Sequence, residues 1–251
     1  MLLHEFKQVE LTERASALLE ALDTRVVIAD GAMGTMLQDR KPTLEDFEGH
    51  EGCNEVLNAT RPDIVLDVHN AYFETGIDCV ETNTFGANWS NLSDYGIDDR
   101  IEELAEAGAR LARQSADGFT AKDSKPRWVL GSMGPGTKLP SLGHTTYDFL
   151  KETFARQAKG LIAGGSDAFM VETSQDLLQT KAAINGCKQA IVESGIRLPI
   201  FVEVTVETTG TMLMGSEIGA ALTALEPLGI DMIGLNCATG PAEMSEHPRQ
   251  L

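Results

Sequence analysis

Short apolar runs alternate with longer amphipathic stretches along the chain. Each run is almost continuously apolar, which is typical of a strand buried on both faces of a parallel sheet. The longer stretches have helical patterns, so strand and helix alternate six times, as in folds with crossover helices. The predicted strands are residues 25–29, 79–82, 128–131, 168–172, 199–204 and 232–236.

Three of the intervening helices have recognisable starts. A capping box with an early proline precedes the first, and a serine that can accept a backbone N–H bond precedes each of the others. The expected helices are residues 60–75, beginning at the box Thr60–Asp63, residues 175–193 after Ser174, and residues 216–228, opened by Ser216 and Glu217.

A weak internal repeat precedes the second, fourth and sixth predicted strands. In each copy a glycine can end the preceding helix in the left-handed conformation, and an aspartate follows just before the strand. The copies indicate repeated βα units, although independent use of the same turn chemistry is an alternative. They are Gly76-Ile77-Asp78, Gly165-Ser166-Asp167 and Gly229-Ile230-Asp231.

Six βα steps fit either an open doubly wound sheet or a closed barrel. The open sheet usually has a glycine-rich phosphate turn after its first strand, and the loop 30–35 lacks those patterns. Polar residues follow all six predicted strands, as at the catalytic end of a barrel. We therefore expect an α/β fold of the (β/α)₈ type, incomplete here with about six units, over residues 25–251 after a helical extension over residues 1–24.

Four carboxylates lie at or near the ends of predicted strands, where they would share one mouth. Burying them without cationic partners would be costly, and the ammonium group of a ligand would be such a partner. The residues alone thus favour an amino-acid substrate, although single carboxylates could pair with Lys or Arg. The four are Asp30, Glu81, Glu172 and Glu203.

The loops after these strands are rich in glycine and small hydroxyl residues, which bring backbone N–H groups close to a ligand and can hold a carboxylate. Tight turns alone would explain any one of these loops. Phe85 and Trp89 are candidates for a pocket wall, with simple packing as the alternative.

Composition narrows the class of protein further. The chain has 251 residues and a formal net charge of −18, with no basic stripe of the kind that nucleic acids require. This charge also disfavours anionic membranes, and no apolar run approaches the roughly 20 residues of a membrane-spanning helix. With no signal peptide, the four separated cysteines predict reduced thiols in a cytoplasmic protein.

Cys237 follows the sixth predicted strand and is the cysteine closest to the expected mouth. A lone cysteine is usually a small buried hydrophobe, and a zinc ligand needs two or three companions. Cys53 is expected in the first loop, Cys187 in a crossover helix and Cys79 at the opposite end of its strand. The residues alone therefore do not establish a metal site.

Several long motifs resemble the homocysteine S-methyltransferase family. They run from about Arg25 onward and are most similar to the module that opens cobalamin-dependent methionine synthases. Because the motifs are long and in order, chance similarity is improbable. They are residues 30–35 (DGAMGT), 51–58 (EGCNEVLN), 81–88 (ETNTFGAN), 131–135 (GSMGP), 171–173 (VET) and 234–241 (GLNCATGP).

The resemblance implies a barrel that binds homocysteine and transfers a methyl group to its zinc-activated thiol, giving methionine. It implies a zinc ligand at Cys237 and a contact between Glu172 and the substrate amine. The family's adjacent pair of further zinc cysteines follows the eighth strand, and we expect it to be absent because the chain ends at Leu251. No residue is assigned as catalytic. The implied substrate-binding residues are Asp30, Gly31, Ala32, Thr35, Asn83, Ser132, Glu172 and Asn236.

The methyl donor depends on segments other than this chain. Within the most similar subfamily the donor is methylcobalamin, and the implied partners are the folate and cobalamin modules of the full-length enzyme. Alternatives are a stand-alone homocysteine methyltransferase that uses S-methylmethionine or betaine, an inactive truncated fragment, and a carboxylate-based lyase barrel.

Overall fold

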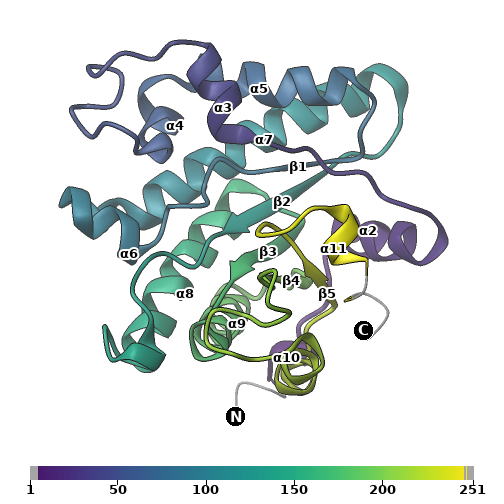
Figure 1. Cartoon of the computed structure of the whole chain (residues 1–251). Helices are drawn as coiled ribbons and strands as arrows, with labels where there is room; N and C mark the ends of the chain where they lie inside the picture. Colours follow the sequence, from purple (N-terminus) through teal and green to yellow (C-terminus); the bar gives the residue numbers. More distant parts are fainter. Residues whose placement is uncertain (1–4, 246, 248–251) are drawn as a thin grey trace.

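The computed structural model describes residues 5–245 and residue 247. Its centre is a five-stranded sheet in which all strands are parallel and neighbours in sequence are neighbours in space. Figure 1 shows the strands side by side with most of the helices on one face of the sheet. The strands are β1 (Cys79–Glu81), β2 (Trp128–Met133), β3 (Ala168–Ser174), β4 (Ile200–Val204) and β5 (Met232–Leu235).

The helices follow the strands in the order that a βα repeat requires. Three long helices, α7, α8 and α9, pack consecutively on the outer face of the sheet. The α-helices are α2 (Glu13–Thr24), α3 (Met33–Asp39), α4 (Leu57–Thr60), α5 (Pro62–Glu74), α6 (Trp89–Leu92), α7 (Ile101–Asp123), α8 (Tyr147–Gly164), α9 (Leu177–Ser194), α10 (Ile218–Leu225) and α11 (Pro241–Met244). The short 3₁₀ helices are η1 (Phe6–Gln8), η2 (Asn54–Val56), η3 (Ser93–Tyr95), η4 (Asp98–Arg100), η5 (Pro140–Leu142) and η6 (Glu226–Leu228).

Alternate side chains of the strands pack into different parts of the core. Phe169, Val171 and Val202 pack with the helices on the outer face. Leu130, Met170 and Phe201 form a separate inner cluster, and Leu18 of α2 packs with them. Because successive side chains of a strand point to opposite faces, the inner-facing residues that follow these apolar ones are polar. The inner face is thus an apolar floor with a polar layer at the carboxyl ends of the strands.

Residues 25–29 were expected to form the first strand, and the structure shows only part of that pairing. Ala29 makes an isolated parallel bridge with Cys79, and Asp30 N donates to the carbonyl of Cys79 at 3.1 Å. Val26 and Ile28 are 81% and 54% exposed. The segment is apolar but lies at an edge of the sheet, where Val27 packs against the inner cluster while Val26 and Ile28, on the other face, lack a covering layer. Five strands and this edge segment therefore replace the six strands predicted.

The Gly-x-Asp repeat is confirmed and has a specific structural role. Gly76, Gly165 and Gly229 have φ of +90°, +92° and +72°, the left-handed conformation that ends a helix at low cost in glycine. Each aspartate then accepts a backbone N–H from the preceding strand or edge segment. The bonds are Ile28 N to Asp78, Val129 N to Asp167 and Ile200 N to Asp231, at 2.9, 2.9 and 2.8 Å.

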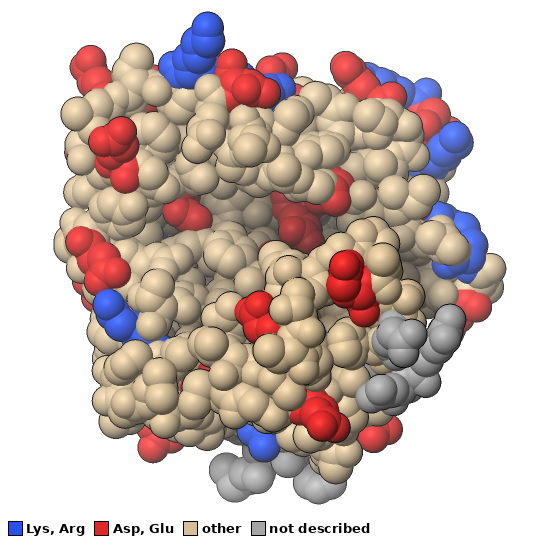
Figure 2. Space-filling model, in the orientation of Figure 1, with Lys and Arg blue, Asp and Glu red and all other residues tan. Residues whose placement is uncertain are grey.

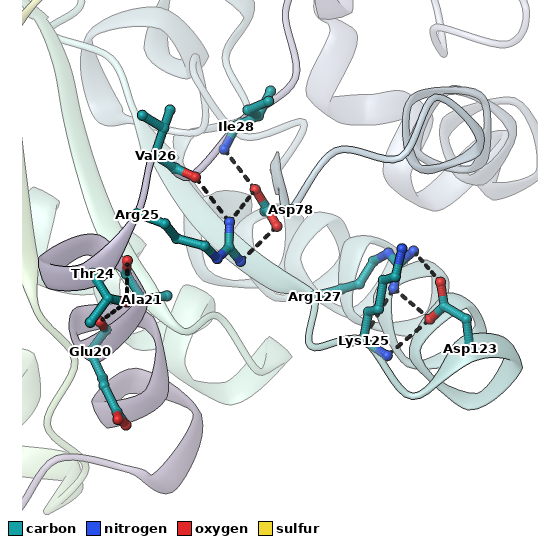
Figure 3. A network of polar contacts seen from close by, with 10 residues as sticks. All are labelled: Glu20, Ala21, Thr24, Arg25, Val26, Ile28, Asp78, Asp123, Lys125 and Arg127. Carbon is teal, nitrogen blue, oxygen red and sulfur yellow. Dashed lines mark hydrogen bonds and ion pairs between the residues drawn. The ribbon is translucent and has the colours of Figure 1, made fainter.

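The first of these aspartates also anchors the edge segment. Figure 3 shows Arg25 reaching Asp78, with which it forms two hydrogen bonds of 2.8 and 2.9 Å, while Ile28 N donates to the same carboxylate. Charge-assisted pairs of this bidentate kind fix geometry as well as adding energy. Residues 25–28 are consequently held beside β1 although the two form little sheet.

Each of the three predicted helices is present but begins two residues later than predicted, and the predicted capping mechanism is partly wrong. Thr60 caps no helix, because its hydroxyl donates to the carbonyls of Asp46 and Val56, and α5 begins at Pro62. Ser174 is the last residue of β3, and Asp176 caps α9 instead by accepting from the N–H groups of residues 178 and 179. The last predicted helix divides into α10 and a 3₁₀ turn, with Pro227 at its start.

No helix among the described residues is long and apolar enough to cross a membrane. The cysteines lie where the strand pattern placed them. Cys53 precedes η2, Cys79 begins β1 and Cys187 lies within α9, and these three are buried, whereas Cys237 is exposed.

Candidate active site

A cavity of about 290 Å³ opens at the carboxyl ends of β1, β2 and β3. Five of the predicted substrate-binding residues line it, namely Asp30, Gly31, Asn83, Ser132 and Glu172. Figure 2 shows the hollow on this face with acidic atoms inside it, whereas Lys and Arg atoms lie toward its margin. The remaining predicted residues, Ala32, Thr35, Asn236 and Cys237, are not among those that line the cavity.

The four carboxylates that the sequence placed at one mouth do interact with one another. Glu81 is affected by the charges of Glu172, Asp30 and Glu203, and Glu203 by that of Glu172. Within residues 5–245 and 247, none of the four forms an ion pair with Lys or Arg. The alternative of pairing with neighbouring cations therefore does not describe this part of the chain.

Burial above the apolar floor raises the pKa of all four carboxylates. Desolvation, which disfavours the charged form, is the largest cause in each case, and the neighbouring carboxylates add to it for Asp30, Glu81 and Glu203. The pKa values of Asp30 and Glu203 rise to about 7 and that of Glu81 to about 9, while the pKa of Glu172 is also raised. Such shifts in a cavity are typical of functional sites.

Asp30 has one oxygen engaged and one free. Its Oδ1 accepts from the backbone N–H of Glu81 at 2.9 Å, which fixes the side chain against β1. Its Oδ2 is buried and has no hydrogen-bond partner among residues 5–245 and 247. A buried carboxylate oxygen without a donor is costly, and an N–H donor of a ligand would satisfy it.

Glu172 is held at both oxygens. Ser132 Oγ donates to Oε1 at 2.6 Å, and Asn236 Nδ2 lies 3.5 Å from Oε2. The bond from Ser132 lowers the pKa of Glu172 and partly opposes the effect of burial. Among the described residues, Glu172 is thus the one of the four carboxylates with a side-chain donor near each of its oxygens.

Asn236 joins the ends of β3 and β5. Its Oδ1 accepts from Thr173 N at 3.0 Å and from Thr205 Oγ1 at 3.4 Å, and its Nδ2 donates to Thr173 Oγ1 at 3.0 Å. With Glu172 as a further acceptor, the amide has protein partners on both its oxygen and its nitrogen. The structure thus gives Asn236 contacts that position Glu172, and the predicted direct substrate contact stays a prediction.

Cys237 lies beside this junction in an unusual backbone conformation. Thr173, Cys237 and Ala238 all have positive φ, at +55°, +59° and +53°, which non-glycine residues seldom adopt and which clusters at functional sites. Thr173 Oγ1 is 3.7 Å from Cys237 Sγ. The ends of β3 and β5 are therefore in contact here, and both have a strained backbone.

Asn83 is fixed by one residue of η2 and one residue of α4. Its Nδ2 donates to Asn54 O at 2.8 Å and to Asn58 Oδ1 at 2.9 Å, so both amide hydrogens have protein acceptors. Asn58 in turn donates to the carbonyls of Asn83 and Leu104. Although Asn83 lines the cavity, its nitrogen serves to join two loops, which leaves only its oxygen for a ligand.

Several residues of the cavity wall had no role predicted from the sequence. Met33, Asn54 and Glu55 all line it. Glu55 is buried, has a raised pKa through desolvation, and accepts from Gly86 N at 2.7 Å. Glu55 belongs to the 51–58 motif, which was the signal that could have found it. Of the two alternatives for Phe85 and Trp89, pocket wall or simple packing, the first holds for Phe85, which lines the cavity. Trp89 instead packs edge-on against Phe149.

Ala32 and Thr35 follow Asp30 in the chain and do not line the cavity. Ala32 precedes α3, and its carbonyl accepts from the Tyr72 hydroxyl at 2.9 Å. Thr35 lies within α3. Their predicted contacts with a substrate stay predictions.

The described residues do not fit a zinc centre by themselves. Across residues 5–245 and 247 there is no group of three or more His, Cys, Asp or Glu side chains arranged to hold a metal ion. Zinc in proteins takes at least three such ligands, and Cys237 is the one thiol at this junction. A zinc centre that includes Cys237 would therefore need ligands from outside the described residues.

Comparison with known proteins gives consistent matches. Residues 27–251 match the family model described as homocysteine S-methyltransferase. Methionine synthases from Mycobacterium leprae (strain TN) and Mycobacterium tuberculosis (strain ATCC 25618 / H37Rv) are 62% and 61% identical over 234 residues, which is 93% of this chain. The chain spans about a fifth of the length of these relatives, 19% and 20%.

Solved structures support the fold. The metallated form of the homocysteine methyltransferase MmuM from Escherichia coli matches with a TM-score of 0.68 at 17% identity, over 95% of this chain and 100% of that one. The apo form matches with a TM-score of 0.67 at 18% identity, over 89% and 76% of the two chains. At this identity the likeness concerns the fold alone.

Proposed function

Because the chain belongs to the homocysteine S-methyltransferase family, we propose that its strand-end cavity binds L-homocysteine for methyl transfer to the sulfur. In this proposal the ammonium group of homocysteine lies between Glu172 and the free oxygen of Asp30. The loop 31–35 receives the substrate carboxylate, and the sulfur points toward Cys237.

A single observation carries the proposal. Several buried carboxylates line or border one cavity with no cationic partner among the described side chains, and Asp30 Oδ2 has no hydrogen-bond donor. An ammonium group supplies both a positive charge and N–H donors, so it would lower the cost of burying this cluster. Neutral or anionic ligands would leave the cost in place.

The residues of this chain would bind and orient the substrate. Glu172, supported by Ser132, would hold the amine so that the sulfur is fixed relative to the strand ends, which reduces the entropic cost of reaching a reactive geometry. Cys237 is the residue that we propose as a ligand of the family's zinc, in company with ligands outside the described residues.

We propose further that the sheet is part of a barrel of the (β/α)₈ type, to which residues 25–251 contribute about six βα units without the last two, with residues 1–24 as a helical extension. The methyl donor would be methylcobalamin, presented by another module of a longer, cytoplasmic protein that also has a folate module. The high identity to proteins named methionine synthase favours this donor over S-methylmethionine or betaine.

Glu172→Gln tests the amine assignment. We expect the affinity for L-homocysteine, measured by calorimetry with a reductant present, to fall at least about tenfold, because an amide cannot replace a charged acceptor. Glu20→Gln is the matched control, since Glu20 lies on α2 under the opposite end of the sheet. Equal affinities for the unaltered chain and the Glu172 variant would remove Glu172 from this role.

A further inference from the structure

Ser132 lies where the pairing between β1 and β2 ends. The register pairs Glu81, the last residue of β1, with Leu130, whereas β2 continues to Met133. Thr82 N still donates to Leu130 O at 2.9 Å, but the chain then turns, with Thr84 N donating to Thr82 O. Backbone groups of β1 therefore do not reach the peptide groups of Ser132.

Beside Ser132, two threonine hydroxyls make the hydrogen bonds that a longer β1 would have made. Ser132 N donates to Thr82 Oγ1 at 3.0 Å, and Thr84 Oγ1 donates to Ser132 O at 2.7 Å. The two hydroxyl oxygens are 2.5 Å apart. Gln157 of α8 adds a donor to the carbonyls of Thr84 and Ser132. The backbone of Ser132 is thus held on both its N–H and its carbonyl side.

The direction of every bond in this group follows from counting hydrogens. A carbonyl oxygen can only accept, so the one hydrogen of Thr84 Oγ1 is used on Ser132 O. Thr82 must then supply the hydrogen between the two hydroxyls, while its oxygen accepts from Ser132 N. The bonds form a closed ring that starts and ends on Ser132, and bonds in such a chain strengthen one another.

We infer that Thr84 is a positioning residue for the amine-binding carboxylate. It is fully buried and is not among the residues that line the cavity, so it acts through Ser132. By fixing the Ser132 backbone it directs the hydroxyl of that serine to Glu172, whose ionised form accepts the bond at 2.6 Å. This inference rests on the proposed binding of the homocysteine ammonium by Glu172.

Thr84→Val opens the ring with little change of shape, because a methyl group replaces the hydroxyl. The side chain is closely packed, since a Cβ built on Gly108 would lie 2.6 Å from the Thr84 methyl. We expect calorimetry with L-homocysteine to show about a fivefold to tenfold weaker affinity, the scale of one lost buried hydrogen bond. Thr84→Ser keeps the hydroxyl and should bind within about twofold of the unaltered chain.

Two readouts distinguish positioning from a general structural defect. In a Ser132→Ala background, Thr84→Val should weaken binding by less than about twofold, because its effect passes through Ser132. In addition, the midpoint of affinity against pH should shift upward in Thr84→Val, since the Ser132 bond lowers the pKa of Glu172. If Thr84→Val does not fold, Thr82→Val opens the same ring; because Thr82 itself lines the cavity, the pH shift and the dependence on Ser132 are then the readouts that decide.

The outcomes separate the inference from the proposed function. Undetectable binding by the unaltered chain, or binding that Glu172→Gln leaves unchanged, would contradict the proposed function and with it this inference. A clear loss in Glu172→Gln with full affinity in Thr84→Val would overturn the inference alone. An equal loss from Thr84→Val with and without Ser132 would show that Thr84 does not act through the serine.

Discussion

Replacing Glu81 with glutamine tests whether the apolar floor controls the charge of the site. Glu81 ends β1 above the inner cluster, and desolvation together with the charges of Glu172, Asp30 and Glu203 raises its pKa to about 9. An unfolded chain would ionise this group near its ordinary pKa of about 4.3. Between those values the folded protein keeps a proton that the unfolded chain has lost, so the contribution to stability falls as pH rises.

The expected size follows from proton linkage. One proton of difference changes the free energy of unfolding by about 1.4 kcal/mol for each pH unit. Between pH 7 and pH 9 the contribution of Glu81 should therefore fall by roughly 3 kcal/mol, as an upper value. Asp30 and Glu203, with pKa values of about 7, lose most of their contribution below this window. Glutamine does not titrate, so the free energy of unfolding of Glu81→Gln lacks the pH-dependent contribution of this side chain.

Urea unfolding at pH 7, 8 and 9, followed by circular dichroism, measures this difference. The unaltered chain should lose about 2–3 kcal/mol more than Glu81→Gln over the two units. Glu20→Gln, on α2 and away from the cavity, should follow the unaltered chain throughout. If Glu81→Gln and the unaltered chain lose the same stability, Glu81 ionises normally and burial does not govern the charge of the cavity.

Two further predictions concern buried groups away from the cavity. Within the part of the chain that the structure describes, His69 has no hydrogen-bond partner at either ring nitrogen, and desolvation lowers its pKa to about 4. The unfolded chain binds that proton below about pH 6.5, so the folded protein should lose roughly 3 kcal/mol of its free energy of unfolding between pH 6.5 and pH 4. His69→Leu should remove this loss in urea unfolding. The same loss of stability in the variant over this pH range would contradict the prediction. Asp167 accepts from Arg14 and Arg113, each at 2.6 Å, so Asp167→Asn should cost about 3 kcal/mol. Asp117→Asn, which removes an exposed partner of the same Arg113, should cost less than about 1 kcal/mol, and similar losses in both variants would refute the distinction.

The apolar runs predicted the strands well because parallel strands in this fold are covered on both faces. Residues 128–131 and 168–172 lie within β2 and β3, which have helices outside and the inner cluster inside. Residues 25–29 have the same apolar pattern but lie at the sheet edge, where pairing reduces to one bridge. Periodicity reports what a segment can bury, and the neighbours that bury it are a property of the tertiary structure.

The sequence predicted where several of the candidate residues lie, and the substrate contacts assigned to them stay predictions. Strand ends were enough to find Glu172 and Ser132, since all carboxyl ends of parallel strands meet at one edge. Asn83 and Asn236 were expected to contact substrate, yet their amide nitrogens have acceptors within the protein. Those acceptors come from segments 25 to 63 residues away, so local sequence gives no indication of them.

The fold and the chemistry of the cavity are connected through alternation along the strands. On β3, Met170 belongs to the apolar floor, and Glu172, two residues later on the same face, belongs to the site. The floor removes water from below, which raises the pKa of the carboxylates and makes an unpaired negative charge costly. In the proposed function the same cost would make the cavity selective, because a ligand would gain most by bringing the positive charge and N–H donors that the cluster lacks. A mutation that admits water beneath Glu172 would therefore weaken ammonium selectivity without altering any residue that touches the ligand.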